Sequence, residues 1–563
     1  YVPLNGVPSY YVSTLKATMD NEMRSMYAKS NSILSDTRVK WGNQYDAHTI
    51  DVMGGFRYMH DSYAVDTQLG YNTGNDKTPA IGGTVNKFSS GSDNSWTSVA
   101  WYAQARYNYR ERYYLQGDLA IESSSRFGRD VTSGFKMCGV PWGVFPSIQA
   151  AWVVTNEDWL NIKGVDYFKL TLGYSMSGND GIEGDASRTY FNSVLFMTQA
   201  NGLTLGNIGN TRVQWETNHR FNVGFDMNVL KNRLNIRFNY FRSKTNNLLT
   251  LKEVGFVSGM TSNWSNGGSL KNRGYDISFN AHLLARKDWN WELGASVGHY
   301  KNKLTALPDG QDYIETNVYG ATVRLQIGQP VNMFYGYKTG VTSSGTCVYA
   351  TTDEAAADGL YLVGINGERE ADFGAGDVKF VDQNGDKIIN EKDMQVIGNP
   401  NPDIYGNIFT SVTYKRLRLD INFNYSLGND VFNYTRMQLE SGSRFMNQTT
   451  AMVNRWRYEG QATDMPKAAY GDPMGNSRFS DRWIEDASYL KFKRLSLSYS
   501  IPFQTNFLQA ISVWFAVNNL CTLTKYLGPD PEFSFGNSTL YQGVDAGYIP
   551  QPRSFQLGVN ISL

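Results

Sequence analysis

The sequence predicts an all-β protein, a transmembrane antiparallel β-barrel, and three observations support this fold class. Apolar residues recur at every second position over segments of nine to twelve residues. The connections between these segments alternate between short and long. No apolar run approaches the ~18–20 residues that a membrane-spanning helix requires. A tilted strand crosses a bilayer in ~9–11 residues, whereas strands of soluble proteins average about 5–6, so the segment length favours a membrane barrel.

The clearest strand pair begins at Phe221. Apolar residues occupy alternate positions from Phe221 to Val229, and the alternation resumes at Leu234 after a gap at Lys231 and Asn232. Successive side chains of a strand point to opposite faces, so one face of each strand is apolar and the other is polar. A barrel in lipid requires this arrangement, with apolar side chains outside, a wet polar interior and no unpaired backbone edge.

The same alternation predicts further strands along residues 1–563. We expect them within residues 103–109, 113–121, 168–174, 275–283, 289–297, 417–427, 495–501, 511–517 and 555–563, with another pair inside 49–72 and a strand that ends at Tyr414. Together the pattern predicts about 15–16 strands. A water-soluble sandwich or propeller is the alternative, but the strand length and the lack of a fixed repeat period argue against it.

The long connections are predicted to lie outside the cell. In bacterial outer-membrane barrels the short turns face the periplasm and the long loops face the exterior. The pattern therefore predicts that Leu563 ends in the periplasm. The predicted extracellular loops are residues 178–218, 244–270, 301–403, 429–488 and 520–551.

The composition bounds the partners and the compartment. Lys and Arg (52) balance Asp and Glu (52), and this zero net charge argues against a nucleic-acid partner. The aromatic content of 14% suits the aromatic girdles of a membrane barrel. Three cysteines, Cys138, Cys347 and Cys521, have no paired spacing, so no disulfide framework is predicted. The chain starts at Tyr1 without a signal peptide, and for an exported barrel we expect an N-terminal part to be missing.

Residues 382–393 form one candidate metal site. Oxygen donors stand at positions 1, 3, 5, 9 and 12 of a calcium-loop pattern, with a backbone carbonyl at position 7. These candidate ligands are Asp382, Asn384, Asp386, Ile388, Asn390 and Asp393. Position 6 is Lys387 instead of Gly, and position 12 is Asp instead of Glu. Bound Ca²⁺ or Mg²⁺ is one interpretation, and a metal-free turn rich in Asp and Asn is the other.

No enzymatic motif is present in the sequence. The five histidines are scattered, and neither a phosphate-binding loop nor a nucleophile motif is readable, so the chain is not expected to be an enzyme. Aromatic residues in the predicted loops could stack on sugars or peptide side chains, but loop packing or a membrane girdle is the better interpretation for each. These residues are Trp264, Tyr349, Tyr361, Trp483 and Tyr541.

Several short segments, taken together and in order, resemble one known family. They are Phe145–Ser147 (FPS), Gly178–Asn179, Trp215–Thr217 (WET), Gly328–Tyr337 (GQPVNMFYGY), Gly376–Asp386 (GDVKFVDQNGD), Val396–Pro402 (VIGNPNP), Glu485–Leu490 (EDASYL) and Pro550–Arg553 (PQPR). This set resembles the SusC-like (SusC/RagA) branch of the TonB-dependent outer-membrane transporters.

The resemblance implies a 22-stranded barrel that is closed by an N-terminal plug. The chain is then expected to be the C-terminal portion of that barrel, with the plug absent. The implied function is active import of bulky nutrients, glycans or peptides, across the outer membrane of a Gram-negative bacterium. The implied partners are outer-membrane lipid, the TonB–ExbB–ExbD complex acting through the plug, and a SusD-like surface lipoprotein acting as a lid. A passive porin and a surface receptor or adhesin are the alternatives. Such barrels usually end in Phe, whereas this chain ends in Leu563.

Overall fold

The computed structural model describes residues 2–3, 21–71, 81, 86–159, 162–196, 200–253, 260, 262–503, 509–533 and 539–562. The chain divides into two compact units, and each is considered by itself. Unit 1 comprises residues 1–150, 173–219 and 245–267, and unit 2 comprises residues 151–172, 220–244 and 268–563. Within the described ranges, no helix combines the length and the apolar character needed to cross a membrane.

Among the described residues, seventeen strands are assigned to one antiparallel sheet. Two of them are short, β1 (Val2–Pro3) and β6 (Phe135–Met137). The other fifteen are β2 (Asn21–Tyr45), β3 (His48–Tyr71), β4 (Asn86–Tyr109), β5 (Tyr113–Ser124), β7 (Val140–Val153), β8 (Val165–Asn179), β11 (Glu216–Val229), β12 (Leu234–Asn246), β15 (Ser269–Ala285), β16 (Trp289–Ala306), β23 (Ile404–Tyr414), β24 (Leu417–Leu427), β27 (Tyr489–Ile501), β28 (Ala510–Thr524) and β30 (Ser554–Ser562). The predicted all-β fold is confirmed, and the fifteen longer strands of this sheet compare with the predicted 15–16.

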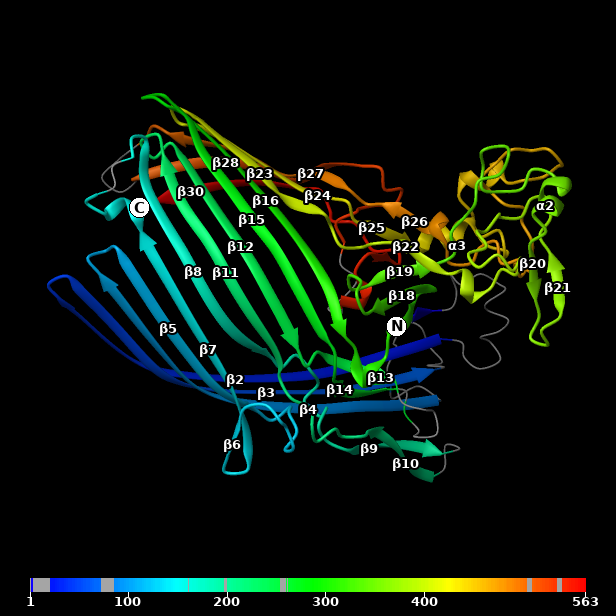
Figure 1. The fold of residues 1–563 in the computed structure, drawn as a ribbon, viewed down its shortest axis with the longest axis horizontal. Coiled ribbons are helices and arrows are strands. Elements are labelled where there is room, and N and C mark those ends of the chain that lie inside the picture. The colour runs from blue at the N-terminus through cyan, green and yellow to red at the C-terminus, as the bar shows by residue number, and fades with distance from the viewer. Residues whose placement is uncertain are drawn as a thin grey trace. The chain divides into compact units, whose positions relative to one another are not determined.

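In unit 1, the longest strands are β2, β3 and β4, drawn in blue in Figure 1. They pair antiparallel in unbroken register, so that His48 lies opposite both Tyr45 on β2 and Tyr109 on β4. The prediction of a strand pair inside residues 49–72 was wrong, because β3 is one strand and its partners lie on either side of it in the sequence. A strand crosses the bilayer in only ~9–11 residues, so only that part of β3 must alternate between apolar and polar side chains. The alternation therefore does not reveal the full length of the strand.

The predicted short turns are present in both units. Arg110 and Glu111 take positive φ values of 51° and 53° between β4 and β5 in unit 1. In unit 2, Lys231 and Asn232 do the same between β11 and β12, at 61° and 58°. Left-handed residues of this kind reverse the chain tightly and keep the strands twisted in the right-handed sense. The short connections therefore hold adjacent strands in the register that the alternation requires.

Smaller sheets and helices occupy the long connections. The strands are β9 (Tyr190–Phe196), β10 (Ala200–Asn207), β13 (Leu249–Glu253), β14 (Ser262–Asn266), β17 (Tyr313–Val318), β18 (Ala321–Gln326), β19 (Met333–Gly336), β20 (Tyr361–Val363), β21 (Arg369–Asp372), β22 (Gln395–Gly398), β25 (Asp430–Asn433), β26 (Ile484–Asp486) and β29 (Val544–Asp545). The α-helices are α2 (Thr352–Asp358) and α3 (Tyr434–Glu440). The 3-10 helices of the long connections are Pro308–Gly310, Glu391–Asp393, Thr450–Asn454, Asp481–Trp483 and Thr539–Tyr541, and Val154–Asn156 lies between β7 and β8.

The two faces of the unit 2 sheet differ in chemistry. The apolar face exposes large side chains on several strands, including Trp291 and Leu293 on β16 and Phe555 and Leu557 on β30, where Leu557 is 75% exposed. Exposing this much apolar surface to water is costly, at about 25 cal/mol per Å². A continuous apolar face of alternating residues is what a strand needs when its neighbour is lipid.

Three long connections of unit 2 pack into one compact body beyond the strand ends, which we call the loop platform (Figure 1). It consists of the described parts of residues 301–403, 429–488 and 520–551. Two of its hydrophobic cores each draw on more than one connection. The first contains Val348, Tyr349, Ala355, Leu360, Phe373, Val378, Phe380, Ile389 and Met474. The second contains Val318, Ala321, Val323, Phe334, Phe432, Phe479, Trp483 and Val544. The platform therefore has the buried interior of a folded domain.

Candidate functional site

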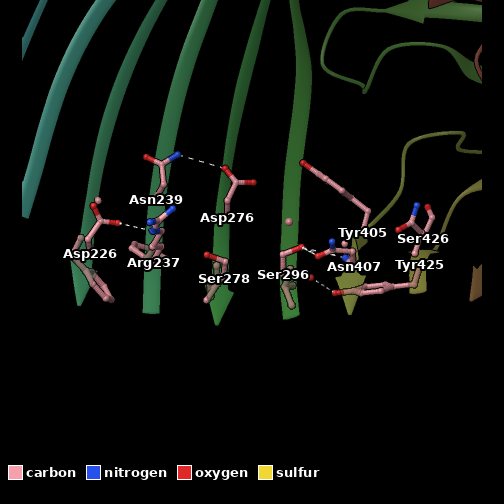
Figure 2. A pocket seen from close by; sticks show the side chains of 18 of the residues that line it. Asp226, Arg237, Asn239, Asp276, Ser278, Ser296, Tyr405, Asn407, Tyr425 and Ser426 are labelled. Carbon is pink, nitrogen blue, oxygen red and sulfur yellow. Dashed lines mark hydrogen bonds and ion pairs between the residues drawn. The ribbon is translucent and has the colours of Figure 1, made fainter. Parts of the chain in front are cut away.

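The polar face of the unit 2 sheet presents hydrogen-bonding side chains on neighbouring strands (Figure 2). This follows from the alternation, because the apolar positions of β11, β12, β15, β16, β23 and β24 share one face and the intervening positions share the other. The sheet lines a cavity of about 610 Å³ there. The polar residues that line it include Asp226, Arg237, Asn239, Asp276, Ser278, Ser296, Tyr405, Asn407, Asn424 and Ser426.

The charges of this cavity are unequally paired. Arg237 Nε lies 3.5 Å from Asp226 Oδ1, so these two side chains neutralise one another. Asn239 Nδ2 donates to Asp276 Oδ2 at 3.5 Å, which is the long limit of a hydrogen bond. Asp276 is exposed and is thus the carboxylate whose oxygens are most available to a ligand.

Two aromatic side chains of β23 lie across glycines of β16. Gly298 pairs with Tyr405 and Gly294 pairs with Phe409 in the antiparallel register. A Cβ atom at Gly298 would lie 2.7 Å from Tyr405 Cζ, and one at Gly294 would lie 2.1 Å from Phe409 Cε1. Glycine is therefore required beneath each ring. Tyr405 remains 36% exposed, and among the described residues its hydroxyl has no hydrogen-bond partner.

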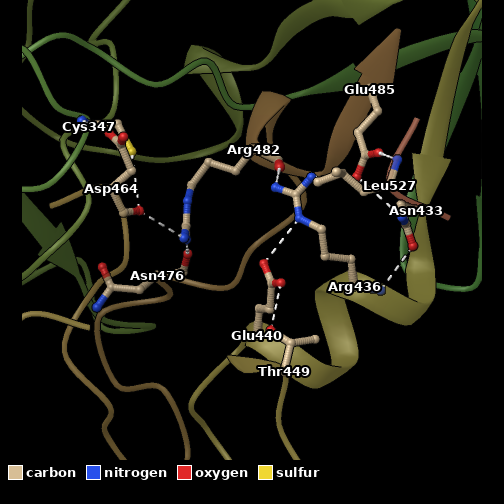
Figure 3. Close-up of polar contacts among 10 residues, drawn as sticks. All are labelled: Cys347, Asn433, Arg436, Glu440, Thr449, Asp464, Asn476, Arg482, Glu485 and Leu527. Atoms are coloured by element: carbon tan, nitrogen blue, oxygen red, sulfur yellow. Dashed lines mark hydrogen bonds and ion pairs between the residues drawn. The ribbon is translucent and has the colours of Figure 1, made fainter. Parts of the chain in front are cut away.

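The loop platform is held together by an ion-pair network around Arg436 of α3 (Figure 3). The guanidinium of Arg436 lies 3.1 Å from Glu440 Oε2, pairs with Glu485 and donates to the carbonyl oxygen of Arg482. Glu485 also accepts a hydrogen bond from the Leu527 amide at 2.8 Å. Both carboxylates are largely buried, so the loss of Arg436 would leave uncompensated buried charge.

Arg482 is a second guanidinium inside the platform, and it contacts carbonyl oxygens. It donates to the carbonyl of Asn476 at 3.0 Å and to that of Asp464 at 3.3 Å. Burial lowers the pKa of Arg482, because desolvation disfavours the charged form. Nearby, the Cys347 amide donates to Asp464 Oδ1 at 3.0 Å, and burial raises the pKa of the Cys347 thiol.

In the candidate metal loop, carboxylates bind backbone amides. Asp382 accepts hydrogen bonds from the amides of Gly385 and Lys387 at 2.7 and 2.9 Å. Asp393 is fully buried and accepts from two amides, those of Gln383 at 2.9 Å and Asn390 at 2.8 Å. Such contacts satisfy both carboxylates locally and support the metal-free interpretation.

The other candidate ligands of this loop make similar contacts. Asn384 Oδ1 accepts from the Asp386 amide at 3.0 Å, and Asp386 Oδ1 accepts from the Ile388 amide at 2.8 Å. Asn390 caps the 3-10 helix Glu391–Asp393. In the part of the chain that the structure describes, no three His, Cys, Asp or Glu side chains are grouped as a metal ion would require. Metal binding at residues 382–393 stays a prediction.

The structure also shows where the candidate aromatic residues of the loops pack. Tyr349 and Trp483 are fully buried in the platform cores, so the loop-packing interpretation is confirmed for both. Trp264 packs against a core of unit 1, and Tyr541 packs against the second platform core. The Tyr361 ring lies 4.3 Å from the Arg369 guanidinium carbon.

Tyr405 is the residue that sequence reasoning missed. It stands one residue before Gly406, among the β23 residues that face the cavity, and only the cross-strand pairing shows that its ring packs over Gly298. An aromatic residue in the polar phase of a strand was the available signal.

A large antiparallel sheet with an apolar exposed face and a polar cavity wall defines the chain as a protein of the outer-membrane β-barrel class. The chain belongs to the TonB-dependent receptor-like β-barrel family, whose model matches residues 5–520. The resemblance to SusC-like transporters is confirmed by curated relatives. TonB-dependent receptor P3 of Formosa agariphila is 28% identical over 572 residues, which cover 97% of this chain and 54% of the relative. TonB-dependent receptor SusC of Bacteroides thetaiotaomicron is 24% identical over 493 residues, which cover 83% of this chain and 44% of the relative.

Solved structures agree on the fold. The RagAB peptide transporter superposes with a TM-score of 0.77 at 22% identity, over 96% of this chain and 56% of that chain. The RagAB peptide importer in its open-open state gives a TM-score of 0.74, over 96% of this chain and 55% of that chain. The chain spans about half the length of the curated relatives it matches. The family consists of transporters and receptors, and it is an outer-membrane family.

Proposed function

We propose that this chain forms the C-terminal barrel wall and the loop platform of an active importer of bulky nutrients in a Gram-negative outer membrane. The two-faced sheet carries this proposal, because an exposed apolar face suits lipid and the opposite face lines a polar cavity. In this proposal the long connections are extracellular. A pore wide enough for such solutes would leak, so a plug closes it, and TonB with ExbB and ExbD supplies the energy through that plug.

The substrate class in this proposal is a glycan or a peptide. The relative named SusC and the RagAB peptide transporter support import as the family activity. The chain carries no catalytic role in this proposal, because the cavity wall contributes hydrogen bonds and ring surfaces that suit binding.

The proposed partner on the loop platform is a SusD-like lipoprotein that acts as a lid. The platform exposes a small apolar cluster that we call the docking patch, made by Phe445, its chain neighbour Met446, and Tyr470. Phe445 is 95% exposed and stacks on Tyr470 with ring centroids 5.3 Å apart. An exposed apolar patch on a folded body is typical of a protein interface.

Energised uptake tests the function. Cells that carry the full-length protein are supplied with a glycan or a peptide as the sole carbon source. The experiment is then repeated in the same strain after deletion of the tonB gene. We expect growth to require both the protein and TonB. Growth that requires the protein but survives the tonB deletion would support the passive porin. Surface binding of the nutrient without any uptake would support the receptor or adhesin.

Co-purification in mild detergent tests the partner. We expect a surface lipoprotein to co-purify with the wild-type protein and to be lost from the double variant Phe445→Ser, Tyr470→Ser. Val341→Ser is the matched control, because Val341 is also an exposed apolar residue of the platform but lies outside the docking patch. Equal recovery of the lipoprotein with both variants would contradict the assignment of the patch.

A further inference from the structure

The short turns at one end of the unit 2 sheet carry an excess of positive charge. They join β11 to β12, β15 to β16 and β23 to β24, at the strand ends opposite the loop platform (Figure 1). Their cations, which we call the basic rim, are Lys231, Arg233, Arg286, Lys287, Lys415 and Arg416. The acidic residue within these turns is Asp288, although acidic and basic residues balance over the whole chain. Asp166 lies beside the first turn, where its carboxylate accepts a hydrogen bond from the Asn232 amide at 2.7 Å.

The three turns form one continuous surface. The His282 amide of β15 donates to the carbonyl oxygen of Arg233 at 2.7 Å, which joins the first turn to the second strand pair. The Lys415 amide donates to the carbonyl oxygen of Asp288, also at 2.7 Å, which joins the second turn to the third. All six side chains of the basic rim are exposed, and among the described residues none of them forms an ion pair. Their charges are therefore available to an anionic partner.

The basic rim borders the apolar face of the same strands. Trp289 of β16 lies opposite Tyr414 of β23, with ring centroids 4.4 Å apart and planes at 38°. The two rings are 44% and 40% exposed. Lys415 Nζ lies 5.4 Å from the centroid of the Tyr414 ring, which places this ammonium group beside the apolar face. Along β16 toward the turn, the order on this side is Leu293, Trp291, Trp289 and then Lys287.

This order of side chains matches the depth profile of one leaflet of a bilayer. Aliphatic side chains suit the hydrocarbon, and Trp and Tyr rings gather at the level of the headgroups. Lysine and arginine lay their stems along apolar surface and keep their charged ends in the polar layer. Clusters of about four to eight cations next to a membrane-spanning segment attract anionic lipids. The six cations of the basic rim lie in this position.

We propose that the basic rim binds the headgroups of anionic phospholipids in the adjacent leaflet. Their acyl chains lie on the apolar face, their glycerol region meets Trp289 and Tyr414, and Lys287 and Lys415 contact the phosphate. An acidic protein would match the charge but would leave the two exposed rings and the apolar face uncovered, whereas a lipid matches all three layers. This inference goes beyond nutrient import, because it concerns the outer surface of the sheet and no substrate. With the long connections outside the cell, the lipids belong to the periplasmic leaflet.

Native mass spectrometry of the full-length protein in detergent tests the lipid site. The protein is titrated separately with dioleoylphosphatidylglycerol, which is anionic, and with zwitterionic dioleoylphosphatidylcholine. We expect the wild type to bind the anionic lipid more tightly. The double variant Lys287→Gln, Lys415→Gln should weaken that binding about 30-fold and leave the zwitterionic lipid unaffected, because each cation near an anionic headgroup contributes ~1 kcal/mol. Lys287→Arg, Lys415→Arg keeps both charges and should retain the preference.

The control is the double variant Lys338→Gln, Lys392→Gln, because it removes the same charge from two exposed lysines of the loop platform. It should bind phosphatidylglycerol like the wild type. Equal binding by the two glutamine variants, or equal affinity of the wild type for both lipids, would overturn the proposal. Inorganic phosphate and polyglutamate are the competing probes. Phosphate bound as tightly as the lipid would indicate a plain anion site, and tighter polyglutamate binding would indicate an acidic protein, and either result would overturn the lipid assignment. None of these outcomes bears on uptake that depends on TonB, so the two proposals fail separately.

Discussion

Replacing Phe432 by alanine should open the loop platform and leave the large sheet intact. Phe432 is fully buried on β25, which pairs antiparallel with β26 and parallel with β29. Its ring meets Phe479 edge-on, with centroids 5.0 Å apart and planes at 89°. The side chain therefore joins segments from the 429–488 and 520–551 connections inside the second platform core.

The cost follows from the burial. Truncation of a fully buried Phe to Ala removes ~3–5 kcal/mol of stability, through lost transfer free energy and the cavity left behind. Each ~1.4 kcal/mol is a factor of ten in an equilibrium constant. Local opening of β25, β26 and β29 should thus become about 100-fold to several thousand-fold more frequent.

Hydrogen exchange measured by mass spectrometry on the full-length protein in detergent reports this opening. We expect faster exchange in peptides that contain residues 430–433, 484–486 and 544–545, and unchanged exchange in β27 and β28. Phe445→Ala is the control, because the exposed Phe445 contributes little to stability. Exchange that differs less than threefold between Phe432→Ala and the wild type would refute a cooperatively packed platform, and equal acceleration in β27 would refute its independence from the sheet.

Four further predictions concern the ion pairs of Lys491, the candidate metal loop and the cysteines. Lys491→Met should leave the buried Asp530 carboxylate without the ammonium group that lies 2.9 Å away. We expect this loss to cost ~3–5 kcal/mol of local stability and to speed proteolysis within residues 520–551. Unchanged cleavage would contradict this. Burial alone would raise the pKa of Glu532, but hydrogen bonds from Lys491 and Lys493 hold it below its usual value. Its stabilising contribution should therefore be complete above about pH 4.3 and disappear as the pH falls through the lowered pKa, which pepsin cleavage across that range measures. EDTA should leave the melting temperature of the platform unchanged, because amides already satisfy Asp382 and Asp393; a rise on adding calcium chloride would support the metal interpretation instead. A maleimide should label the exposed Cys138 at neutral pH well before Cys347, whose thiol pKa is raised by burial, and the reverse order by peptide mapping would contradict that burial.

The strands were the most predictable part of the molecule, because lipid imposes a period of two. The predicted strand 417–427 matches β24 (Leu417–Leu427), where alternation is unbroken. In contrast, β2 (Asn21–Tyr45) was not predicted. Its apolar residues are interspersed with charges, and its position is set by the register with β3, which is a long-range property.

The loop platform could not be predicted from local pattern. Phe334, Phe432 and Val544 meet in one core, yet they come from three different connections. Each looks like an isolated apolar residue in a loop until the connections pack together. The motif residue Glu485 illustrates the same limit, because it joins Arg436 to Leu527 across the sequence.

The candidate site was partly predictable. The alternation places Asp226, Arg237 and Asp276 on the polar face, and their presence there required no structure. Which of them meet, and which remain available, depends on cross-strand register. Tyr405 packs over Gly298 because the register sets the two residues opposite one another.

The interpretation of this sheet as a membrane barrel wall depends on which of its faces meets lipid. Two neighbouring positions of β23 test it, because Ile408 lies in the apolar phase and Asn407 in the polar phase. Ile408→Cys and Asn407→Cys are each introduced into the full-length protein after its native cysteines are replaced, spin-labelled and reconstituted in lipid nanodiscs. We expect the label at Ile408 to be relaxed by lipid-soluble oxygen and the label at Asn407 by a water-soluble nickel complex. Equal accessibility of both positions to the nickel complex, or the reverse order, would contradict a membrane barrel wall.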